Sequence, residues 1–590
     1  MIVMDDMTDI AARFDWRRDH LGREGGTLPP YAAIVADFEW NLPAGFNIAA
    51  ACADDWGAID PARVALIEDR GDDAAPIETS FEELATRSRR LAAGLQSLGI
   101  TRGDRVAIVL PQCVEAALAH LAVYRLGAIA VPLAQRFGPE ALGFRLAAAG
   151  CRLAVVDDSV LETLAAIETP LADMSTLVVA DRGSAFLGAP QAPAGFHQIS
   201  FATVEAHGPI EPPCVQTTPD DPAMIIFTSG TTGAPKGALH GHRVLIGHLP
   251  GMRFFHEGFP HSGDRLWTPS DWAWAGGLLN ALLPSLYYGV PVVFTRARFI
   301  AEEALAMMAR RRVRNAFLPA TALRMMKAAA TPERLAALSL RTIGSAGESL
   351  PAATYEWARQ AFDAPVNEFY GQTECNMVLG SAAGAGASKP GRIGPAAPGH
   401  KVAILKADGM LAAPGEAGTI AVKSPDPVMF LGYWQNEAAT DAKFAGDWLL
   451  TGDQGVADAT GSIAFLGRDD DIITSAGYRI GPSEVEDCLL RHPAVKLAAV
   501  VGKPDPVRTE IVKAYVVAMD GHVADEALGR EIAAFVRARL SVHEYPREIA
   551  FVDEMPMTTS GKIIRRHFRT LAAEEAQQMR SATVARPPQR

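Results

Sequence analysis

The sequence predicts an α/β protein with a large N-terminal domain of parallel-rich sheets and a small α+β C-terminal domain. Short runs of Val, Ile, Ala and Leu alternate with helical patterns over residues 64–179 and again over 265–362, which is typical of βαβ units. After residue 467 a separate pattern of strands and amphipathic helices begins, and its length is that of an ordinary domain. With 590 residues, 49% of them hydrophobic, the chain can bury more than one large core.

The clearest single unit lies near the start of the first block. Residues 106–110 and 128–132 are apolar enough to form strands, and the helical pattern of residues 113–126 separates them. The later block repeats this order with shorter strands. There we expect strands at 265–268, 290–294, 315–318 and 342–345, and helices at 302–312 and 352–362.

The texture of the sequence changes twice toward the C-terminus. Residues 397–467 combine short strands with many Gly and Pro, which predicts a β-rich subdomain at the end of an N-terminal domain that spans residues 1–469. A C-terminal domain is expected over residues 470–575, and residues 576–590 as a disordered tail. The elements expected in these parts are strands at 402–405, 418–422, 495–502 and 513–519 and helices at 483–491 and 527–540.

The composition argues against several classes of function. A formal net charge of −13 disfavours a nucleic-acid partner, because such a surface needs concentrated positive charge. The six cysteines are far apart and lack metal-ligand spacing, so we expect reduced thiols in a cytoplasmic protein. The longest apolar stretch, residues 278–294, is interrupted by Asn, Pro and Gly, and residues 1–18 lack the features of a secretory signal. We therefore expect no membrane span.

A loop of glycine, hydroxyl and lysine residues follows an apolar strand and is the most informative motif. Glycines let backbone N–H groups converge on one point, and the hydroxyls and the lysine add donors, so the loop suits phosphate. It differs from a Walker A loop, because Pro235 precedes Lys236 and Gly237 follows it. The alternative is a flexible turn between two elements. The candidate phosphate-binding residues are Thr228, Ser229, Gly230, Thr231, Thr232, Gly233 and Lys236.

A second cluster occupies residues 368–374, with the sequence Glu-Phe-Tyr-Gly-Gln-Thr-Glu. The ring of Tyr370 can stack on a base, Thr373 can reach a phosphate, and Glu374 can bind the hard cation that accompanies a triphosphate. The alternative is a corner between a strand and a loop with a buried tyrosine.

Three weaker signals follow the same logic. Residues 344–348 form a turn of small residues that lets a flat ligand approach the backbone. Asp453 can accept hydrogen bonds from two ribose hydroxyls, and Arg468 can bind ribose or phosphate. Lys562 ends another loop of hydroxyl, glycine and lysine residues. Taken singly, each of these segments is more often a turn, a surface ion pair or a solvated basic loop.

The joint presence of these motifs in one order resembles the adenylate-forming, or AMP-binding, superfamily of acyl-CoA synthetases, peptide-synthetase adenylation domains and luciferases. The resemblance covers residues 46–569 and is strongest to members like the medium-chain and acetyl-CoA synthetases. It implies a ligase: a carboxylate attacks the α-phosphate of ATP to give acyl-AMP and pyrophosphate, and CoA thiolate then takes the acyl group and releases AMP. Mg²⁺ is the implied cofactor.

The resemblance also implies roles for individual residues. Lys562, Glu374 and Thr373 would be catalytic, with Lys562 bridging carboxylate and α-phosphate and Glu374 holding Mg²⁺. Besides Lys562, Thr373 and the phosphate loop, the implied ATP-binding residues are Gly347, Glu348, Ser349, Glu368, Phe369, Tyr370, Gly371, Gln372, Asp453, Arg468 and Arg479.

In the superfamily the C-terminal domain swings between the two half-reactions, and here the hinge falls at Asp470. The implied CoA-binding residues are Ala476, Gly477, Tyr478 and Arg508. The implied acyl pocket contains Trp272, Trp274 and Gly371. Because acetate-specific members place a tryptophan where this chain has Gly371, the resemblance favours a medium-chain fatty or aryl acid. His240 and His242 are interpreted as packing or hydrogen-bonding residues.

Two other functions remain open at this point. An acid:carrier-protein ligase would use the same chemistry, although no carrier domain follows Lys562. A non-catalytic nucleotide-binding regulatory protein would keep the fold but not need Lys562, Glu374 and Asp453 intact. Relatives are switched off by acetylation of the lysine that matches Lys562, so a lysine acetyltransferase and a deacetylase are possible partners.

Overall fold

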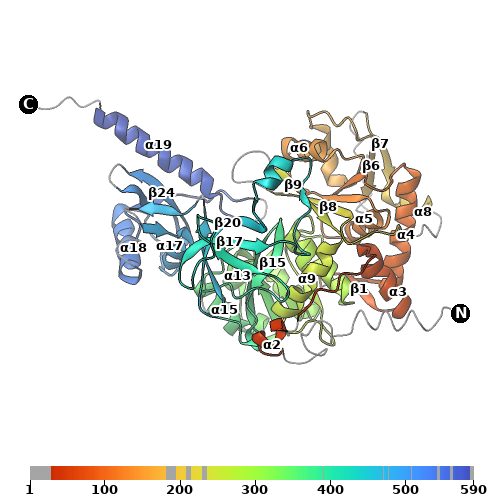
Figure 1. The fold of residues 1–590 in the computed structure, drawn as a ribbon, viewed down its shortest axis with the longest axis horizontal. Helices are drawn as coiled ribbons and strands as arrows, with labels where there is room; N and C mark the ends of the chain where they lie inside the picture. The colour runs from red at the N-terminus through yellow and green to blue at the C-terminus, as the bar shows by residue number, and fades with distance from the viewer. Residues whose placement is uncertain are drawn as a thin grey trace, which may run out of the picture.

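The computed structural model describes residues 28–36, 38–72, 74–180, 195–207, 214–228, 235–389, 391–469, 471–475, 478–505, 508–540, 545–558 and 562–584. Within these residues the N-terminal domain contains two eight-stranded sheets and a five-stranded sheet, and the C-terminal domain contains another five-stranded sheet. Figure 1 shows the C-terminal domain, in blue, at one end of the molecule. This architecture confirms the predicted α/β class and its division into a large and a small domain.

The first eight-stranded sheet has the order β18-β9-β8-β4-β3-β5-β6-β7. Its strands from β8 to β7 are parallel, and β8 and β9 form an antiparallel hairpin whose connection is the predicted phosphate loop. The strands are β3 Arg105–Val109, β4 Ile129–Pro132, β5 Leu153–Asp157, β6 Thr176–Ala180, β7 His197–Ser200, β8 Pro222–Thr228, β9 Lys236–Gly241 and β18 Gly432–Tyr433.

The second eight-stranded sheet has the order β15-β14-β13-β12-β10-β11-β1-β2. All of its strands are parallel except the edge strands β2 and β15, so the carboxyl ends of β10, β12, β13 and β14 lie along one edge. The strands are β1 Val64–Glu68, β2 Ile77–Ser80, β10 Leu266–Trp267, β11 Val292–Phe294, β12 Asn315–Phe317, β13 Thr342–Ser345, β14 Val366–Gln372 and β15 Cys375–Gly380.

Helices cover these two sheets and supply the core between them. In α5, Val114–Arg125, ten of the residues after Glu115 are buried, which explains why its sequence is apolar on all sides. In α4, Phe81–Ser97, the helix begins with a capping box between Ser80 and Glu83. The other helices of this domain are α2 Tyr31–Ala36, α3 Asp55–Ile59, α6 Pro139–Ala149, α7 Leu161–Ala165, α8 Phe201–His207, α9 Arg243–Phe255, α10 Ala275–Gly277, α11 Leu283–Tyr287, α12 Ala301–Arg310, α13 Ala320–Ala329, α14 Pro332–Ala336 and α15 Ala352–Ala361.

The β-rich subdomain is an antiparallel sheet with the order β16-β17-β20-β19, and β21 pairs with the other side of β20. The register of β20 and β21 places Asp453 opposite Arg468. Asp453 and Arg468, which belong to two separate sequence motifs, are therefore neighbours in one hairpin. The elements are β16 Val402–Leu405, β17 Ala417–Lys423, β19 Phe444–Ala445, β20 Trp448–Ala457, β21 Ile463–Arg468 and α16 Glu437–Asp441.

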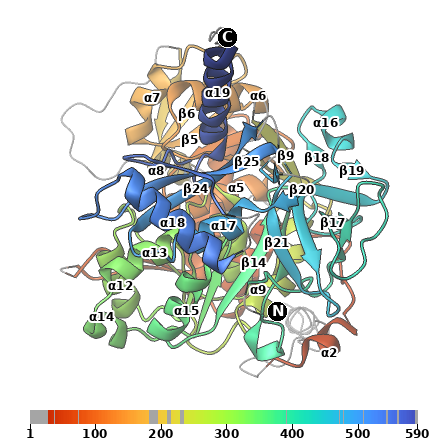
Figure 2. The same ribbon diagram turned by 90° about the vertical axis from the view of Figure 1, so that its left-hand side faces the viewer.

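The C-terminal domain packs three helices on a sheet with the order β23-β22-β25-β24, and β26 pairs with β25. Figure 2 shows this domain in front of the N-terminal domain, with α17 beside β21. The elements are β22 Ile473–Ser475, β23 Tyr478–Ile480, β24 Val495–Asp505, β25 Thr509–Ala518, β26 Glu548–Phe551, α17 Pro482–Leu489, α18 Glu526–Arg539 and α19 Arg565–Val584.

One expected boundary is wrong. Residues 576–584 belong to α19 and are not part of a disordered tail, while residues 585–590 lie outside the described residues. The first half of α19 is held by packing, because Phe568 is buried with its ring centre 4.6 Å from that of Tyr515. Figure 1 shows the helix projecting from the domain. Because the last residues are rich in Pro and Arg, the sequence did not indicate that α19 continues to Val584.

Two further observations concern expectations from composition. Every cysteine is a free thiol, and all except Cys214 are buried. In the described parts of the chain, no helix combines the length and the apolar character that crossing a bilayer requires.

Candidate active site

The candidate site lies where the carboxyl ends of β10, β12, β13 and β14 meet the β8–β9 hairpin and the β20–β21 hairpin. In open α/β sheets ligands bind at this edge, because the connecting loops there diverge and leave a crevice. Most of the residues implied by the resemblance come from these loops, and Lys562 enters from the C-terminal domain.

Asp453 is the centre of a hydrogen-bonded group on β20. Tyr370 donates its hydroxyl proton to Asp453 Oδ2 (2.5 Å), and Gln372 Nε2 donates to the same oxygen (2.8 Å). The other oxygen, Oδ1, is buried, accepts no hydrogen bond from the described residues and lies 3.8 Å from Arg468 Nη1. Burial raises the pKa of the Asp453 carboxyl. A buried oxygen without a donor is suited to accept from a ligand, and a ribose hydroxyl satisfies it.

Glu348 fixes the loop after β13 to the start of α13. Its Oε2 accepts the hydroxyl proton of Thr321 (2.8 Å), its Oε1 accepts the Thr321 backbone N–H (2.5 Å), and Arg324 Nη2 lies 3.6 Å from Oε2. The preceding residue, Gly347, has φ +91°, which L-residues with a side chain rarely adopt. The Glu348 side chain therefore holds the loop in place, and the exposed backbone beside it is the surface offered to a flat ligand.

Glu374 and Lys236 lie on either side of Tyr433. The Tyr433 hydroxyl donates to Glu374 Oε1, and Lys236 Nζ lies 5.1 Å from the centre of the Tyr433 ring. Glu374 is only 7% exposed. Mg²⁺ is commonly bound by one or two carboxylates together with phosphate oxygens and water, so this donor set fits a nucleotide-bound Mg²⁺.

Lys562 ends a short loop of the C-terminal domain. Lys562 N–H donates to Thr558 Oγ1 (3.0 Å), and Thr558 N–H donates to Lys562 O (2.7 Å). Although its side chain keeps contact with solvent, surrounding protein atoms lower the pKa of Lys562, and the charges that act on its ammonium belong to Glu348, Arg468 and Asp453. The Lys562 ammonium is therefore within electrostatic reach of these three residues of the N-terminal domain.

An ion pair supports the Lys562 loop from behind. Arg565 donates through Nε to Glu486 Oε1 (2.9 Å), and Nη2 bonds to Oε2. Arg569 Nη1 lies 3.1 Å from Asp471 Oδ1, directly after the expected hinge residue. The buried Glu486 also accepts the Val500 backbone N–H (2.9 Å). The start of α19 is thus tied both to α17 and to the chain beside the hinge.

Two carboxyl groups, one in each domain, have raised pKa values. Burial and, to a smaller extent, the charge of Asp487 raise the pKa of Glu368, on β14, to about 7. Burial likewise raises the pKa of Asp487, on α17, to about 7; neighbouring Glu486 adds to this rise, while Arg491 and Arg324 oppose it. Both carboxyls are therefore partly protonated near neutral pH.

The structure does not bring every implied residue into the cleft. Phe369 is 2% exposed and its ring stacks on Phe255 at 5.0 Å, so this side chain belongs to the core. Trp272 packs against Phe294, with ring centres 5.5 Å apart, whereas Trp274 packs against Phe137, with centres 5.8 Å apart. The two tryptophans thus point into different cores and do not form one pocket wall.

Gly371 lies where the β14–β15 hairpin is tightly packed. A Cβ placed on it would lie 2.5 Å from both Asn376 Cα and Met377 N, which belong to β15. The missing side chain lets the β14–β15 hairpin close, and the space beside Gly371 is filled by backbone. Asn376 itself donates through Nδ2 to Asn280 Oδ1 (2.7 Å) inside the core.

The last group of implied residues comes from the phosphate loop, the hinge and the segments expected to bind CoA. Arg508 lies at the β24–β25 turn, where its backbone N–H donates to Asp505 Oδ1 (2.8 Å). Tyr478 and Arg479 belong to β23, and their side chains lie outside the described residues, as do Ser229, Gly230, Thr231, Thr232, Gly233, Asp470, Ala476 and Gly477. Of the two histidines, His242 is buried and its Nδ1 accepts the Ile48 N–H (3.2 Å), which agrees with a packing role.

Sequence reasoning missed Tyr433, Thr321 and Lys443. Lys443 Nζ lies 3.3 Å from Leu450 O and 3.4 Å from Thr451 O, and so supports the loop before Asp453. An aromatic pair at residues 433 and 434 was the one available signal, and it does not reveal a partner far away in the sequence.

Two models of known protein families match this chain. Residues 54–434 match the family model described as AMP-binding enzyme. The chain belongs to this family. Residues 484–562 match the model of the AMP-binding enzyme C-terminal domain, which begins within α17 and extends to Lys562.

Relatives of this AMP-binding enzyme include human mitochondrial acyl-coenzyme A synthetase ACSM4, which is 34% identical over 91% of this chain and 93% of the relative. A protein of Bacillus subtilis named uncharacterized acyl-CoA ligase YtcI is 32% identical over 83% of this chain and 90% of its own length.

Solved structures show the same fold. A Brucella canis acyl-CoA synthetase superposes with a TM-score of 0.70 at 35% identity, covering 93% of this chain and all of the other (100%). The anthranilate CoA ligase AuaEII, solved with anthranoyl-AMP, gives a TM-score of 0.80 at 26% identity over 92% and 99% of the two chains.

Proposed function

We propose that this protein is an ATP-dependent, AMP-forming acyl-CoA synthetase that acts on a medium-chain fatty or aryl acid. The observation that carries the proposal is the position of Lys562. The charges of Glu348, Asp453 and Arg468, all in the N-terminal domain, influence the pKa of the Lys562 ammonium in the C-terminal domain, and this supports its approach to the end of the cleft where a nucleotide is expected.

The first half-reaction explains why a lysine is needed there. A carboxylate and the α-phosphate of ATP are both anionic and repel each other, so their reaction needs a positive charge between them. The ammonium group of Lys562 would supply this positive charge. Lys562 would thereby stabilise the five-coordinate phosphorus as the acyl–oxygen–phosphorus bond forms and the bond to pyrophosphate breaks.

Other residues would hold the nucleotide in line. Asp453 Oδ1, buried and without a hydrogen-bond donor among the described residues, would accept from a ribose hydroxyl. Lys236 would neutralise the leaving pyrophosphate together with the loop that precedes it. Mg²⁺, when bound on Glu374 and phosphate oxygens, would supply charge neutralisation at the phosphates. Tyr433, which donates to Glu374, would fix the orientation of that carboxylate.

For the second half-reaction we propose that the C-terminal domain turns at Asp470 and presents Ala476, Gly477 and Tyr478 to the pantetheine arm of CoA, while Arg508 binds a CoA phosphate. The thiolate attacks the acyl carbonyl, and AMP leaves. Two solved relatives are named for aryl acids: the anthranilate CoA ligase AuaEII and a benzoate CoA ligase from Burkholderia xenovorans LB400, the latter with 26% identity and a TM-score of 0.76. They support an acid larger than acetate.

A panel of acids tests the proposal. The purified chain with ATP, Mg²⁺ and CoA would receive acetate, hexanoate, octanoate, benzoate or anthranilate, and AMP and thioester would be measured separately. We expect both products with at least one acid of six or more carbons and little with acetate. Pyrophosphate exchange without any thioester would instead favour a carrier-protein ligase, and no exchange with any acid would contradict the assignment as an enzyme.

We also propose that acetylation of Lys562 by a lysine acetyltransferase switches off the first half-reaction, and that a deacetylase restores it. Acetylation removes the positive charge on which that step depends. Mass spectrometry of the protein purified from its own cells, with and without deacetylase treatment, should show the modified residue and a matching change in pyrophosphate exchange. Unmodified Lys562 under all growth conditions would contradict this.

A further inference from the structure

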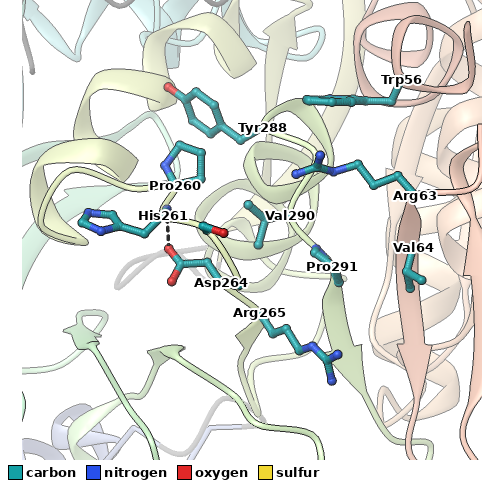
Figure 3. Close-up of a pocket in the computed structure, with 12 residues that line it drawn as sticks. Trp56, Arg63, Val64, Pro260, His261, Asp264, Arg265, Tyr288, Val290 and Pro291 are labelled. Atoms are coloured by element: carbon teal, nitrogen blue, oxygen red, sulfur yellow. Dashed lines mark hydrogen bonds between the residues drawn. The ribbon is translucent and has the colours of Figure 1, made fainter. Parts of the chain in front are cut away.

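A second cavity lies on the side of the N-terminal domain away from the candidate active site. It has a volume of about 550 Å³ and an opening to solvent. Figure 3 shows Trp56 and Arg63 on one side, Pro260, His261 and Asp264 on the other, and Val290 and Pro291 between them. Small-molecule sites in proteins commonly have volumes of 300–1,000 Å³ and apolar walls with a few fixed polar groups. This cavity has both properties.

The cavity lies at the amino ends of three neighbouring strands. Val64 is the first residue of β1, Arg265 precedes β10, and Pro291 precedes β11. Because these strands are parallel, their opposite ends face the cleft that holds the implied nucleotide site. The same strands connect the two places: β11 ends at Phe294, whose ring packs on Trp272. The cavity is therefore separate from the catalytic residues but continuous with the strands that support them.

Arg63 presents a guanidinium that is held in place but not neutralised. Its Nε donates to Gly289 O (2.5 Å), and its plane lies over the Trp56 ring at 4.5 Å from the ring centre. The neighbouring Asp60 is 3.8 Å away and both side chains are well exposed, at 38% and 50%. An exposed pair at that distance contributes little, so the terminal nitrogens of Arg63 can still bind an anion.

Arg265 is the second cation of the cavity. Its Nη1 donates to Arg311 O (2.9 Å), and within the described residues no carboxylate lies at salt-bridge distance from it. Asp264 does not compensate this charge, because its buried carboxylate is bonded twice by Arg341, at 3.1 and 2.8 Å, and lies 3.6 Å from Arg314. The cavity lining thus contains the two guanidiniums of Arg63 and Arg265 and one carboxylate, that of Asp264, which already pairs with Arg341 and Arg314. A local excess of positive charge is unusual in a chain of net charge −13.

We infer that this cavity binds a small organic oxyanion, a carboxylate or a phosphate ester, attached to a flat apolar group. Guanidinium groups bind both oxyanions through paired N–H donors. The apolar walls formed by Trp56, Val290 and Pro291 would cover the flat part of the ligand, as aromatic and apolar surfaces do in small-molecule sites. The site is independent of the reaction proposed for the cleft.

The test uses full-length protein labelled with 5-fluorotryptophan and saturated with AMP and Mg²⁺, so that the nucleotide site is filled. The fluorine signal of Trp56 is assigned from its loss in Trp56→Phe. Benzoate, phenyl phosphate and the uncharged benzamide are titrated separately. We expect benzoate, phenyl phosphate or both to shift the Trp56 signal in a saturable way, and benzamide to bind at least fivefold more weakly. The stronger of the two anions identifies the chemical source of the ligand.

Variants separate this site from the acyl pocket. Arg265→Gln and Arg63→Gln should each raise the dissociation constant read from Trp56 at least fivefold, whereas Arg265→Lys should retain more of the affinity. Circular dichroism and basal activity in the absence of these anions check that the variants fold. A titration that moves only the Trp272 or Trp274 signals, an equal response to benzamide, or undiminished binding in both Gln variants would overturn the inference.

Discussion

The ammonium group of Lys236 and the carboxylate of Glu374 lie on either side of Tyr433, which contacts the first through its ring and the second through its hydroxyl. The phosphate loop and the β14–β15 hairpin belong to different sheets, so Tyr433 joins two halves of the site that share no strand. Its hydroxyl orients the carboxylate proposed to bind Mg²⁺.

Tyr433→Phe should therefore weaken the apparent affinity for Mg²⁺ while the protein still folds. The ring near Lys236 stays, but Glu374 loses a hydrogen bond to a charged group, which is worth about 1.5–3 kcal/mol. We expect the Mg²⁺ concentration for half-maximal pyrophosphate exchange to rise about tenfold or more. Tyr31→Phe, which removes a hydroxyl that donates to Ala396 O (2.9 Å) away from the cleft, is the matched control. Equal Mg²⁺ curves for the two variants would contradict the role of Tyr433.

Lys562→Ala should reduce acyl-adenylate formation by at least about 100-fold, the scale seen when one preorganised donor to a transition state is removed. Thioester formation from supplied acyl-AMP should persist, because that step does not need the ammonium group. Pyrophosphate exchange measures the first step and thioester release the second. Lys496→Ala, which changes an exposed lysine of the same domain, should leave both rates near those of the wild type. Wild-type exchange in Lys562→Ala would refute the mechanism.

The raised pKa values of Glu368 and Asp487 predict a dependence on pH. Since the docked orientation raises both pKa values to about 7, it binds protons more tightly than a separated arrangement does. Docking is thus strongest below the ordinary carboxyl pKa values, weakens as the pH rises from there to about 7, and changes little above.

Asp487→Asn should remove most of this dependence. The ratio of pyrophosphate exchange in Asp487→Asn to that in the wild type should increase between pH 5 and 7, roughly threefold or more, and then level off. Taking the ratio cancels effects on ATP and on Lys562. Asp553→Asn, at an exposed position of the same domain, should give a ratio independent of pH. A flat ratio for Asp487→Asn would show that the two carboxyls do not oppose each other.

Substitutions of Gly371 by Trp and Ala distinguish two reasons for a glycine at this position: room in the acyl pocket, or close packing of the β14–β15 hairpin. If Gly371 merely leaves room in the acyl pocket, the variant should fold and shift its preference toward short acids. The clash of any Cβ with β15 predicts instead that even Gly371→Ala destabilises the N-terminal domain, by about 1–3 kcal/mol as expected for overpacking. Calorimetric melting of Gly371→Ala measures this. Gly138→Ala, where a Cβ meets no atom within 4 Å, is the control.

The attachment of α19 depends on a buried charge cluster. Lys503 and Lys513, 3% and 4% exposed, are paired with Glu548 and Glu575, and Glu575 is the member that α19 supplies. Glu575→Ala leaves two nearly buried ammonium groups with one carboxylate, so we expect a loss of about 1–3 kcal/mol. For a domain of this size that lowers the melting temperature by several degrees. Glu574→Ala, at the exposed neighbouring position, should leave it unchanged.

Local patterns predicted most elements closely. The strands at 342–345 and 402–405 have the predicted bounds, and the second is a short apolar run of Val, Ala, Ile and Leu. The helix expected at 527–540 is found at Glu526–Arg539, where Asp525 caps its first turn. The end of α19 was missed, because the Pro- and Arg-rich composition of the last ten residues was taken to begin the tail.

The sequence predicted the candidate site less completely than it predicted the fold. The motifs identified the residues that cluster around Asp453, but they could not separate the buried Phe369 from its neighbour Tyr370, because strand residues alternate between two faces. The Tyr433 bond to Glu374 joins residues 59 positions apart, and no local pattern encodes such a pairing. The Trp272 and Trp274 side chains likewise enter different cores only once the sheets are assembled.

The two ion pairs at the start of α19 have a consequence for how the enzyme can be tuned. Arg565 and Arg569 tie the start of α19 to Glu486 and Asp471, so the loop of Lys562 and the chain next to the proposed hinge would move together as one rigid unit. Changes in hinge stiffness would then alter how often the Lys562 loop reaches the cleft, but not the position that the lysine takes up once it is there.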